Sequence, residues 1–178
     1  GYKAIAVNVS DIAAMNGTPK QVTVSLGLSN RFSVEAIEKL YEGVLAACRD
    51  YKVDLVGGDT TTSRSGLVIA VSVTGSTSDE QVTYRSGAQL HDIVCVTGDL
   101  GAAYIGMQVL EREKQEFLGN PDMQPKLAKY EYVVGRQLRP KARMDIIHEL
   151  QGLQIVPHAM IDISDGLNSE LFHICKQS

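Results

Sequence analysis

The sequence lacks the features that would place this protein in a membrane, on nucleic acid or in an oxidising compartment. No apolar run reaches the roughly 20 residues that a membrane-spanning helix needs, and no signal peptide is visible. The net charge is −4, whereas general nucleic-acid binding needs a basic surface. The three cysteines show neither metal-ligand spacing nor a disulfide framework. We therefore expect a cytoplasmic protein that binds neither membranes nor nucleic acid.

Several catalytic motifs are also missing. The four histidines have no metal-binding spacing, and no serine lies in a nucleophile-elbow pattern. An apolar run precedes Gly98-Asp99-Leu100-Gly101 and a helical pattern follows it, an order typical of phosphate-binding turns. However, no Gly-Lys-Ser/Thr follows, and the glycines do not make a clean dinucleotide fingerprint. This segment is therefore only weak evidence of function.

What the chain does have is the composition of an ordinary globular protein. Its 178 residues are 44% hydrophobic and 21% charged, which suits one domain or parts of two. The small polar residues 75–80 are the candidate boundary, so we predict domains at residues 1–78 and 79–178. Helical and strand patterns alternate on both sides of it, and the expected fold class is α+β or α/β.

Hydrophobic periodicity predicts the elements of the first half. Alternation predicts a half-buried strand over residues 21–28, and dense β-branched residues predict another over residues 67–74. Apolar residues at three- and four-residue steps predict an amphipathic helix over residues 34–51, capped by the serine before it. We interpret residues 2–9 as a strand, with a helical start as the alternative, and Ser10-Asp11 as the cap of a short helix.

The second half has shorter predicted elements and no internal repeat. Strands are expected at residues 82–84, 93–97 and 160–163. Helices are expected over residues 102–116, 126–138 and 144–150 and from Leu167 onward, with a loop at residues 117–125.

The sequence Gly57-Gly58-Asp59, followed by three threonines, is the first candidate site. It comes after Leu55-Val56, which we interpret as the end of a buried strand, so a turn is predicted here. Glycine lets a ligand approach the main chain closely. An aspartate beside exposed N–H groups and hydroxyls is well placed to hold a hard cation against phosphate oxygens. An ordinary Gly-Gly-Asp turn without function is the competing interpretation.

Aspartates at other predicted turns favour the functional interpretation. Asp11, Asp162 and Asp165 join Asp59, and the spacing of Asp162 and Asp165 lets both face one cleft. Carboxylates gathered in this way repel one another unless a cation neutralises them, and Mg²⁺ prefers oxygen ligands. Arg85 is either a phosphate contact or an ordinary surface arginine. From these residues alone, the prediction is a Mg²⁺-dependent enzyme that acts on phosphates.

Three motifs, in order and properly spaced, resemble those of the thiamine-monophosphate kinase family. They are residues 8–17, Gly57-Gly58-Asp59-Thr60-Thr61 and Asp162-Ile163-Ser164-Asp165-Gly166-Leu167. The similarity spans nearly the whole chain. The family is part of the aminoimidazole ribonucleotide synthetase-like superfamily. The two threonines after Asp59 and the Ser164-Asp165-Gly166 sequence favour the kinase branch over the synthetase and the hydrogenase-maturation dehydratase.

The resemblance implies ATP-dependent phosphorylation of thiamine monophosphate to thiamine diphosphate, by direct in-line transfer without a covalent intermediate. It implies that Asp59 and Asp165 are catalytic. The implied Mg²⁺ ligands are Asp11, Asp59, Asp162 and Asp165. The implied ATP contacts are Tyr41, Gly58, Asp59, Arg85 and Ser164. Without the resemblance, Tyr41 is interpreted as a partly buried packing residue.

The resemblance also implies a homodimer of two-domain subunits. The N-terminal sheet would join that of a second subunit in a barrel, and the C-terminal sheet would be flanked by helices. The family's aspartate-rich motif before residue 1 and its thiamine contacts after Ser178 are absent, so we expect a fragment that lacks both ends. The alternatives are another ATP-using superfamily member and a nucleotide-binding or dimerisation module without catalysis.

Overall fold

A computed structural model describes residues 1–178, which divide into two compact units. The sheet unit comprises Gly1–Cys95 and Ala142–Ser178, and the helical unit comprises Val96–Lys141. Each is described separately below. None of the helices combines the length and the apolar character needed to cross a bilayer. The predicted division into residues 1–78 and 79–178 stays a prediction.

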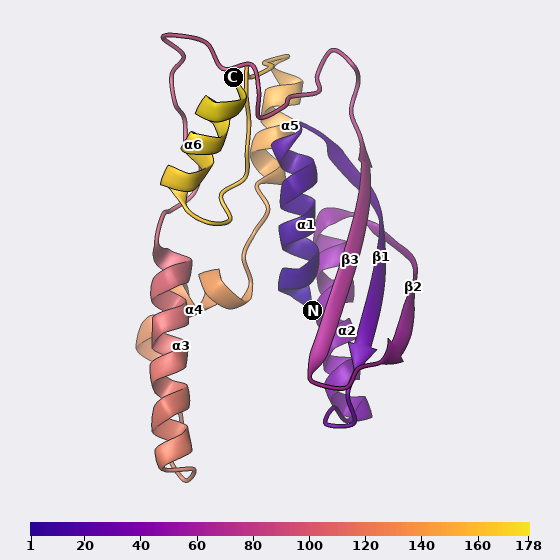
Figure 1. Cartoon of the computed structure of the whole chain (residues 1–178), viewed down its shortest axis with the longest axis vertical. Coiled ribbons are helices and arrows are strands. Elements are labelled where there is room, and N and C mark those ends of the chain that lie inside the picture. The colour runs from indigo at the N-terminus through magenta and orange to yellow at the C-terminus, as the bar shows by residue number, and fades with distance from the viewer. The chain divides into compact units, whose positions relative to one another are not determined.

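The sheet unit is built on three strands in the order β2-β1-β3 (Figure 1). The central strand, β1 (Thr18–Leu28), is parallel to β2 (Asp54–Thr62) and antiparallel to β3 (Leu67–Ser76). The predicted strands at residues 21–28 and 67–74 are thereby confirmed. Their alternating side chains bury one face of the sheet and leave the other exposed, as the period of two requires.

Two helices cover the buried face of the sheet. α1 (Tyr2–Ala14) packs on β3 and β1, and α2 (Val34–Tyr51) packs on α1 and β2. The predicted cap of α2 is confirmed, because the Ser33 hydroxyl accepts a hydrogen bond from the Ala36 N–H group at 3.3 Å. The strand, helix and cap predicted from local pattern therefore form as expected.

The prediction for the start of the chain is wrong. Residues 2–9 belong to the helix α1 rather than to a strand, and Ser10-Asp11 lies inside that helix instead of capping one. The buried positions Tyr2, Ile5 and Val9 follow helical spacing. The β-branched residues in this segment favour an extended chain locally, but burial of one side against α2 and the sheet stabilises the helix instead.

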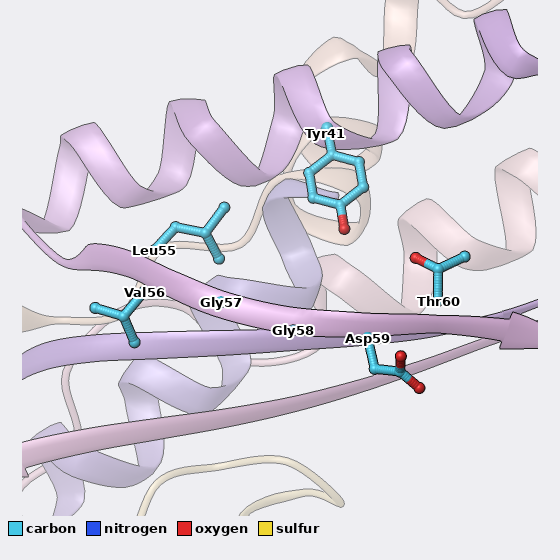
Figure 2. Close-up of a pocket in the computed structure, with 7 residues that line it drawn as sticks. All are labelled: Tyr41, Leu55, Val56, Gly57, Gly58, Asp59 and Thr60. Carbon is cyan, nitrogen blue, oxygen red and sulfur yellow. The ribbon is translucent and has the colours of Figure 1, made fainter.

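The predicted Gly-Gly-Asp turn is also wrong. Residues 57–59 continue β2 and pair with Thr23, Val24 and Ser25 of β1 (Figure 2). The register shifts between Val22 and Thr23, which leaves Val56 as an extra, bulged residue on β2. The central strand supplies the hydrogen-bonding partner that converts this glycine-rich stretch into an edge strand.

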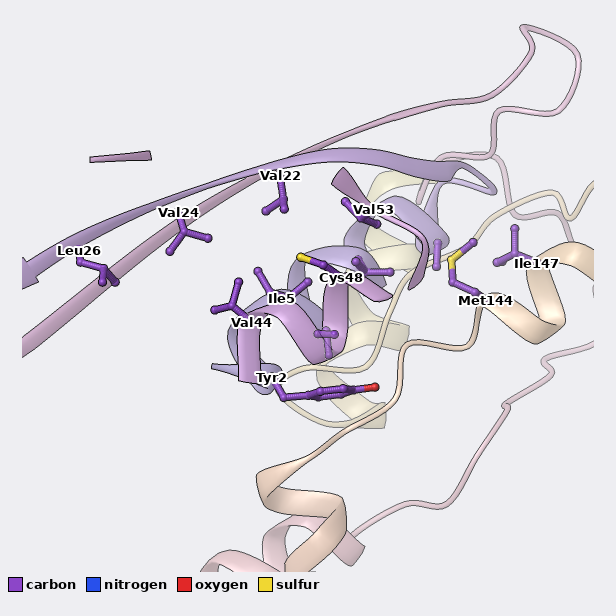
Figure 3. Close-up of a cluster of buried hydrophobic side chains, with 14 residues drawn as sticks. Tyr2, Ile5, Val22, Val24, Leu26, Val44, Cys48, Val53, Met144 and Ile147 are labelled. Carbon is purple, nitrogen blue, oxygen red and sulfur yellow. The ribbon is translucent and has the colours of Figure 1, made fainter. Parts of the chain in front are cut away.

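The hydrophobic core lies between the sheet and the helices (Figure 3). Val22, Val24 and Leu26 of β1 are each 1% exposed and face the helices. α5 (Met144–Gly152), predicted at residues 144–150, adds Met144 and Ile147 to the same core. The Tyr51 hydroxyl accepts a hydrogen bond from the Ala142 N–H group at 2.9 Å, which holds the chain that leads into α5.

The strands predicted in the second half do not form. Residues 82–84, 93–97 and 160–163 are extended or irregular, and a single bond from the Met160 N–H group to the Tyr84 carbonyl, 2.9 Å, joins two of them. Ile93 is 88% exposed, so this apolar segment is not buried as a strand in the core would be. Apolar sequence alone does not make a strand without a neighbour to complete its hydrogen bonds.

The remaining helices are close to their predicted places. In the helical unit, α3 (Ala102–Gly119) packs against α4 (Glu131–Leu138), which the 3₁₀ turn η1 (Ala128–Tyr130) precedes. In the sheet unit, α6 (Leu167–Gln177) follows the loop of residues 162–166. α3 runs past its predicted end into the predicted loop at residues 117–125.

Candidate functional site

The edge strand β2 and the helix α2 form a pocket of about 470 Å³. Tyr41 reaches from α2 toward β2, and residues 55–60 of β2 line the rest (Figure 2). Three predicted ATP contacts therefore lie around one pocket: Tyr41, Gly58 and Asp59, the last of which is also a predicted metal ligand. Tyr41 also packs against the core, so its bland interpretation as a packing residue is correct as far as it goes.

The two faces of β2 carry different chemistry. Thr60 lies on the side of Tyr41, whereas Asp59 points to the other side of the strand (Figure 2). Asp59 pairs in register with Ser25, which belongs to the exposed face of the sheet. The Asp59 carboxylate is thus presented on the face that α1 and α2 leave open.

The two glycines of β2 have different roles. A Cβ atom at Gly57 would meet nothing within 4 Å, so the main chain is open to a ligand there. A Cβ atom at Gly58 would overlap the Val24 carbonyl oxygen of β1. Gly58 is therefore required by the close approach of two strands, and its place beside the pocket follows from that packing.

A second pocket, which is apolar and has a volume of about 360 Å³, adjoins the first and shares Tyr41 with it. Its walls come from the end of β1 and the first turns of α2. They are Leu28, Phe32, Ser33, Val34, Ile37, Glu38 and Tyr41. Tyr41 thus separates a polar, strand-lined pocket from an apolar one.

Three other predicted site residues are electrostatically coupled. Burial and the nearby Asp162 carboxylate raise the pKa of Asp11, and Arg85 opposes them. The Asp162 carboxylate disfavours ionisation of Asp11, and a cation or a phosphate group beside Arg85 would relieve that repulsion.

The loop of residues 162–166 presents Asp162, Ser164 and Asp165. The Ser164 hydroxyl donates to Asp162 Oδ2 at 3.1 Å. Glu170 Oε1 accepts hydrogen bonds from the Ser164 and Asp165 N–H groups, at 3.2 and 3.0 Å. Sequence reasoning missed Glu170, although an acid in the first helical turn after a loop is a known capping pattern.

The structure does not assemble all four predicted Mg²⁺ ligands. Asp11 and Asp162 lie near each other, but no group of three or more His, Cys, Asp or Glu side chains is arranged to hold a metal ion. Asp59 projects from the exposed face of the sheet and is not part of the Asp11 cluster. The assignment of these four aspartates as Mg²⁺ ligands stays a prediction.

Comparison with known proteins tests the family resemblance that the sequence motifs predict. Residues 1–77 match the family "AIR synthase related protein, N-terminal domain". The thiamine-monophosphate kinase of Bacillus subtilis is 38% identical over 178 residues, which is 100% of this chain and 52% of that protein. The predicted resemblance to thiamine-monophosphate kinases is confirmed. The chain spans about half the length of the curated relatives it matches.

Solved structures extend the resemblance from sequence to fold. The structure of AaThiL complexed with AMPPCP and TMP has a TM-score of 0.86 and 35% identity, covering 99% of this chain and 52% of that one. The thiamine monophosphate kinase of Aquifex aeolicus gives a TM-score of 0.84 at 37% identity, covering 99% of this chain and 56% of that one. The mixed α+β fold of this chain therefore matches the fold of about half of each of these kinases.

Proposed function

We propose that the protein containing this chain is a thiamine-monophosphate kinase, which transfers the γ-phosphoryl group of ATP onto thiamine monophosphate to give thiamine diphosphate. The observation that carries the proposal is the likeness of 99% of this chain to a structure that binds AMPPCP, an ATP analogue, and TMP. The residues agree with it. The coupled cluster of Asp11, Asp162 and Arg85 is suited to phosphate groups and their counter-ions.

In the proposed mechanism the chain's own residues bind and orient the reactants. Asp11, Asp162 and Asp165 would hold Mg²⁺ at the loop, and Asp59 would hold it at the strand. When bound, Mg²⁺ would neutralise the negative charge that builds up on the transferring phosphoryl group. Arg85 would add charge to the ATP phosphates. Tyr41, Gly58 and Ser164 would contact the nucleotide.

This assignment agrees with the lack of a nucleophile-elbow serine in the chain. The acceptor is already an anionic phosphate oxygen, so it needs no activation by a serine or a histidine. Phosphoryl transfer depends mainly on alignment and on charge stabilisation. We propose that Asp59 and Asp165 supply these by positioning, and that transfer is direct and in line.

A homodimer is the second part of the proposal. The sheet face that α1 and α2 leave open carries exposed apolar side chains, among them Val56 at 54% and Val68 at 56%. A second copy packed against this face would bury them and would close the two sheets into a barrel. Asp59 projects from the same face. The dimer would therefore bring Asp59 to the subunit interface.

A C-terminal sheet flanked by helices is the third part. Residues 93–97 form an exposed apolar segment with no strand beside it, and Ile93 is 88% exposed. In the whole protein we propose that this segment pairs with other strands in a sheet that helices flank. Pairing would satisfy its main-chain hydrogen bonds and cover its side chains.

The decisive experiment is formation of thiamine diphosphate from ATP and thiamine monophosphate by the full-length protein, with and without Mg²⁺. Product that depends on Mg²⁺ supports the kinase. ATP binding without product would favour another ATP-using member of the superfamily. A full-length protein that does not turn over ATP, and whose ATP binding is unchanged when Asp59 is replaced, would be a binding or dimerisation module instead.

A further inference from the structure

A buried carboxylate lies behind the loop of residues 162–166, and the mechanism proposed above does not use it. Glu170, in the first turn of α6, is 6% exposed. Its Oε1 atom accepts hydrogen bonds from the main-chain N–H groups of Ser164, at 3.2 Å, and Asp165, at 3.0 Å. The partners of this acid are therefore two main-chain amides.

These two bonds tie the loop to the helix that follows it. The residue before α6 is Gly166, whose φ of 121° is one that other residues rarely adopt and which has no side chain to cap the helix. The Glu170 N–H group donates to the Gly166 carbonyl at 3.2 Å. Through its side chain Glu170 bonds to Ser164 and Asp165, and through its main chain to Gly166, so it contacts three successive residues before the helix.

A carboxylate would be an unfavourable side chain at position 170 if its only role were to fill the space behind the loop. Removing a carboxylate from water costs free energy, and two charge-assisted hydrogen bonds recover part of that cost. An apolar side chain of similar volume would avoid that cost, but it would leave the two N–H groups without this acceptor. What Glu170 adds is a fixed direction for the Ser164 and Asp165 amides.

Those amides belong to residues whose side chains form the proposed site. The Ser164 hydroxyl already bonds to Asp162 Oδ2 at 3.1 Å, so fixing Ser164 also restrains Asp162. A loop that must order itself when a ligand arrives weakens binding, because ordering costs entropy. A loop held in place beforehand avoids that loss.

We propose that Glu170 is a positioning residue for phosphoryl transfer. Its buried carboxylate holds the amides of Ser164 and Asp165 so that the side chains of the loop face the nucleotide and its Mg²⁺, and Glu170 itself touches neither. This inference rests on the proposed kinase function, which it deepens by one residue and one role.

The test compares two substitutions in the full-length protein. Glu170→Gln keeps an acceptor oxygen for both amides, whereas Glu170→Leu keeps much of the volume and removes the acceptor. The matched control is Glu131→Ala, an exposed glutamate in the first turn of α4. Thermal melting identifies any variant that has not folded. Glu170→Met takes the place of the leucine variant if the latter does not fold.

The first readout is amide hydrogen exchange in the absence of nucleotide. Exchange at residues 162–166 should rise by about tenfold or more in the leucine variant, because the loop opens more often. The glutamine and control variants should stay near wild type. Unchanged exchange in the leucine variant would overturn the proposal, whatever the enzyme's activity.

The second readout is steady-state kinetics with Mg²⁺ and ATP. The leucine variant should lose roughly 10- to 100-fold in kcat/KM for ATP, as changes to residues that orient ligands do. The glutamine variant should stay within about threefold. Equal losses in both variants would overturn the proposal. A wild-type protein without kinase activity would remove the proposed function, and the exchange result would then describe the loop alone.

Discussion

Gly58 of β2 lies directly against the carbonyl oxygen of Val24, its register partner in β1, and a Cβ atom at Gly58 would overlap that oxygen. Its neighbour Gly57 has open space where its side chain would be. The two glycines are adjacent in one strand, yet only Gly58 is required by packing. Gly57 leaves the main chain accessible beside the pocket.

The first prediction follows from this difference. Gly58→Ala should destabilise the fold by about 3 kcal/mol or more, because the clash involves main-chain atoms that cannot move aside. Gly57→Ala should change the free energy of unfolding by less than about 1 kcal/mol. Urea denaturation of both variants checks the contrast. Similar destabilisation by the two substitutions would contradict the strand packing described here.

Asp59→Asn should lower turnover roughly 10- to 100-fold and leave the fold intact. Asp59 is exposed on β2, so the change removes the proposed metal-binding charge without disturbing the core. Asp54→Asn, at an exposed position at the start of the same strand, is the control and should be near normal. Turnover at different Mg²⁺ concentrations measures the effect. Near-normal turnover in Asp59→Asn would exclude Asp59 from the metal site.

Acid should loosen the helical unit through Glu113. This side chain is 5% exposed, accepts a bond from the Lys126 N–H group at 2.7 Å and pairs with Arg112 at 2.6 Å. The Lys126 N–H group, followed by Arg112, holds the pKa of Glu113 below its usual value. The stabilisation is therefore present above the unfolded pKa of about 4.3 and is lost as the pH falls through the lower, folded value.

Hydrogen exchange of residues 120–130 between about pH 6 and pH 3 tests this dependence. In the wild type, the protection of these amides from exchange should decrease as the pH is lowered, after correction for the intrinsic exchange rate. Glu113→Gln should flatten the dependence, because its amide does not titrate in this range. Glu116→Gln, an exposed site on the same helix, should behave as wild type. An unchanged slope in Glu113→Gln would argue against the contact.

The cysteines should differ in reactivity. Cys48 is buried in the core, and burial raises the pKa of its thiol, with a smaller opposing effect from Arg49. Cys95 and Cys175 are exposed. Because the thiolate is the reactive form, alkylation of Cys48 at pH 8 should be about tenfold slower or more. Peptide mass spectrometry would follow the three sites. Unfolding in urea should abolish the difference in rate. Fast labelling of Cys48 in the native protein would contradict its burial in the core.

Local pattern predicted those elements whose own side chains define them. The period of two along β1 and the stripe along α2 are complete within each segment, and Ser33 caps α2 with its own hydroxyl. The candidate site residues were also within reach of sequence, because motif spacing points to Asp11, Asp59 and the loop before α6. Tyr41 and Gly58 do line one pocket with Asp59.

Sequence reasoning failed where a distant neighbour decides the outcome. Residues 2–9 have β-branched side chains, but α2 and the sheet bury one helical stripe of them. The prediction of a turn at Gly57-Gly58-Asp59 did not allow for β1 as a hydrogen-bonding partner. The Glu170 contacts span only five and six residues, yet they depend on how the loop folds back over α6.

By itself the sequence determined the chemistry available to this protein: aspartates, an arginine and glycines at motif spacing, without a conventional nucleophile or metal-binding histidines. It also determined β1, β3 and α2, because their amphipathic patterns are local. Only the tertiary structure decided that α1 is a helix, that β2 is a strand with Asp59 on its open face, and that Glu170 holds the loop. Those outcomes depend on burial and hydrogen bonding between segments that local periodicity does not encode.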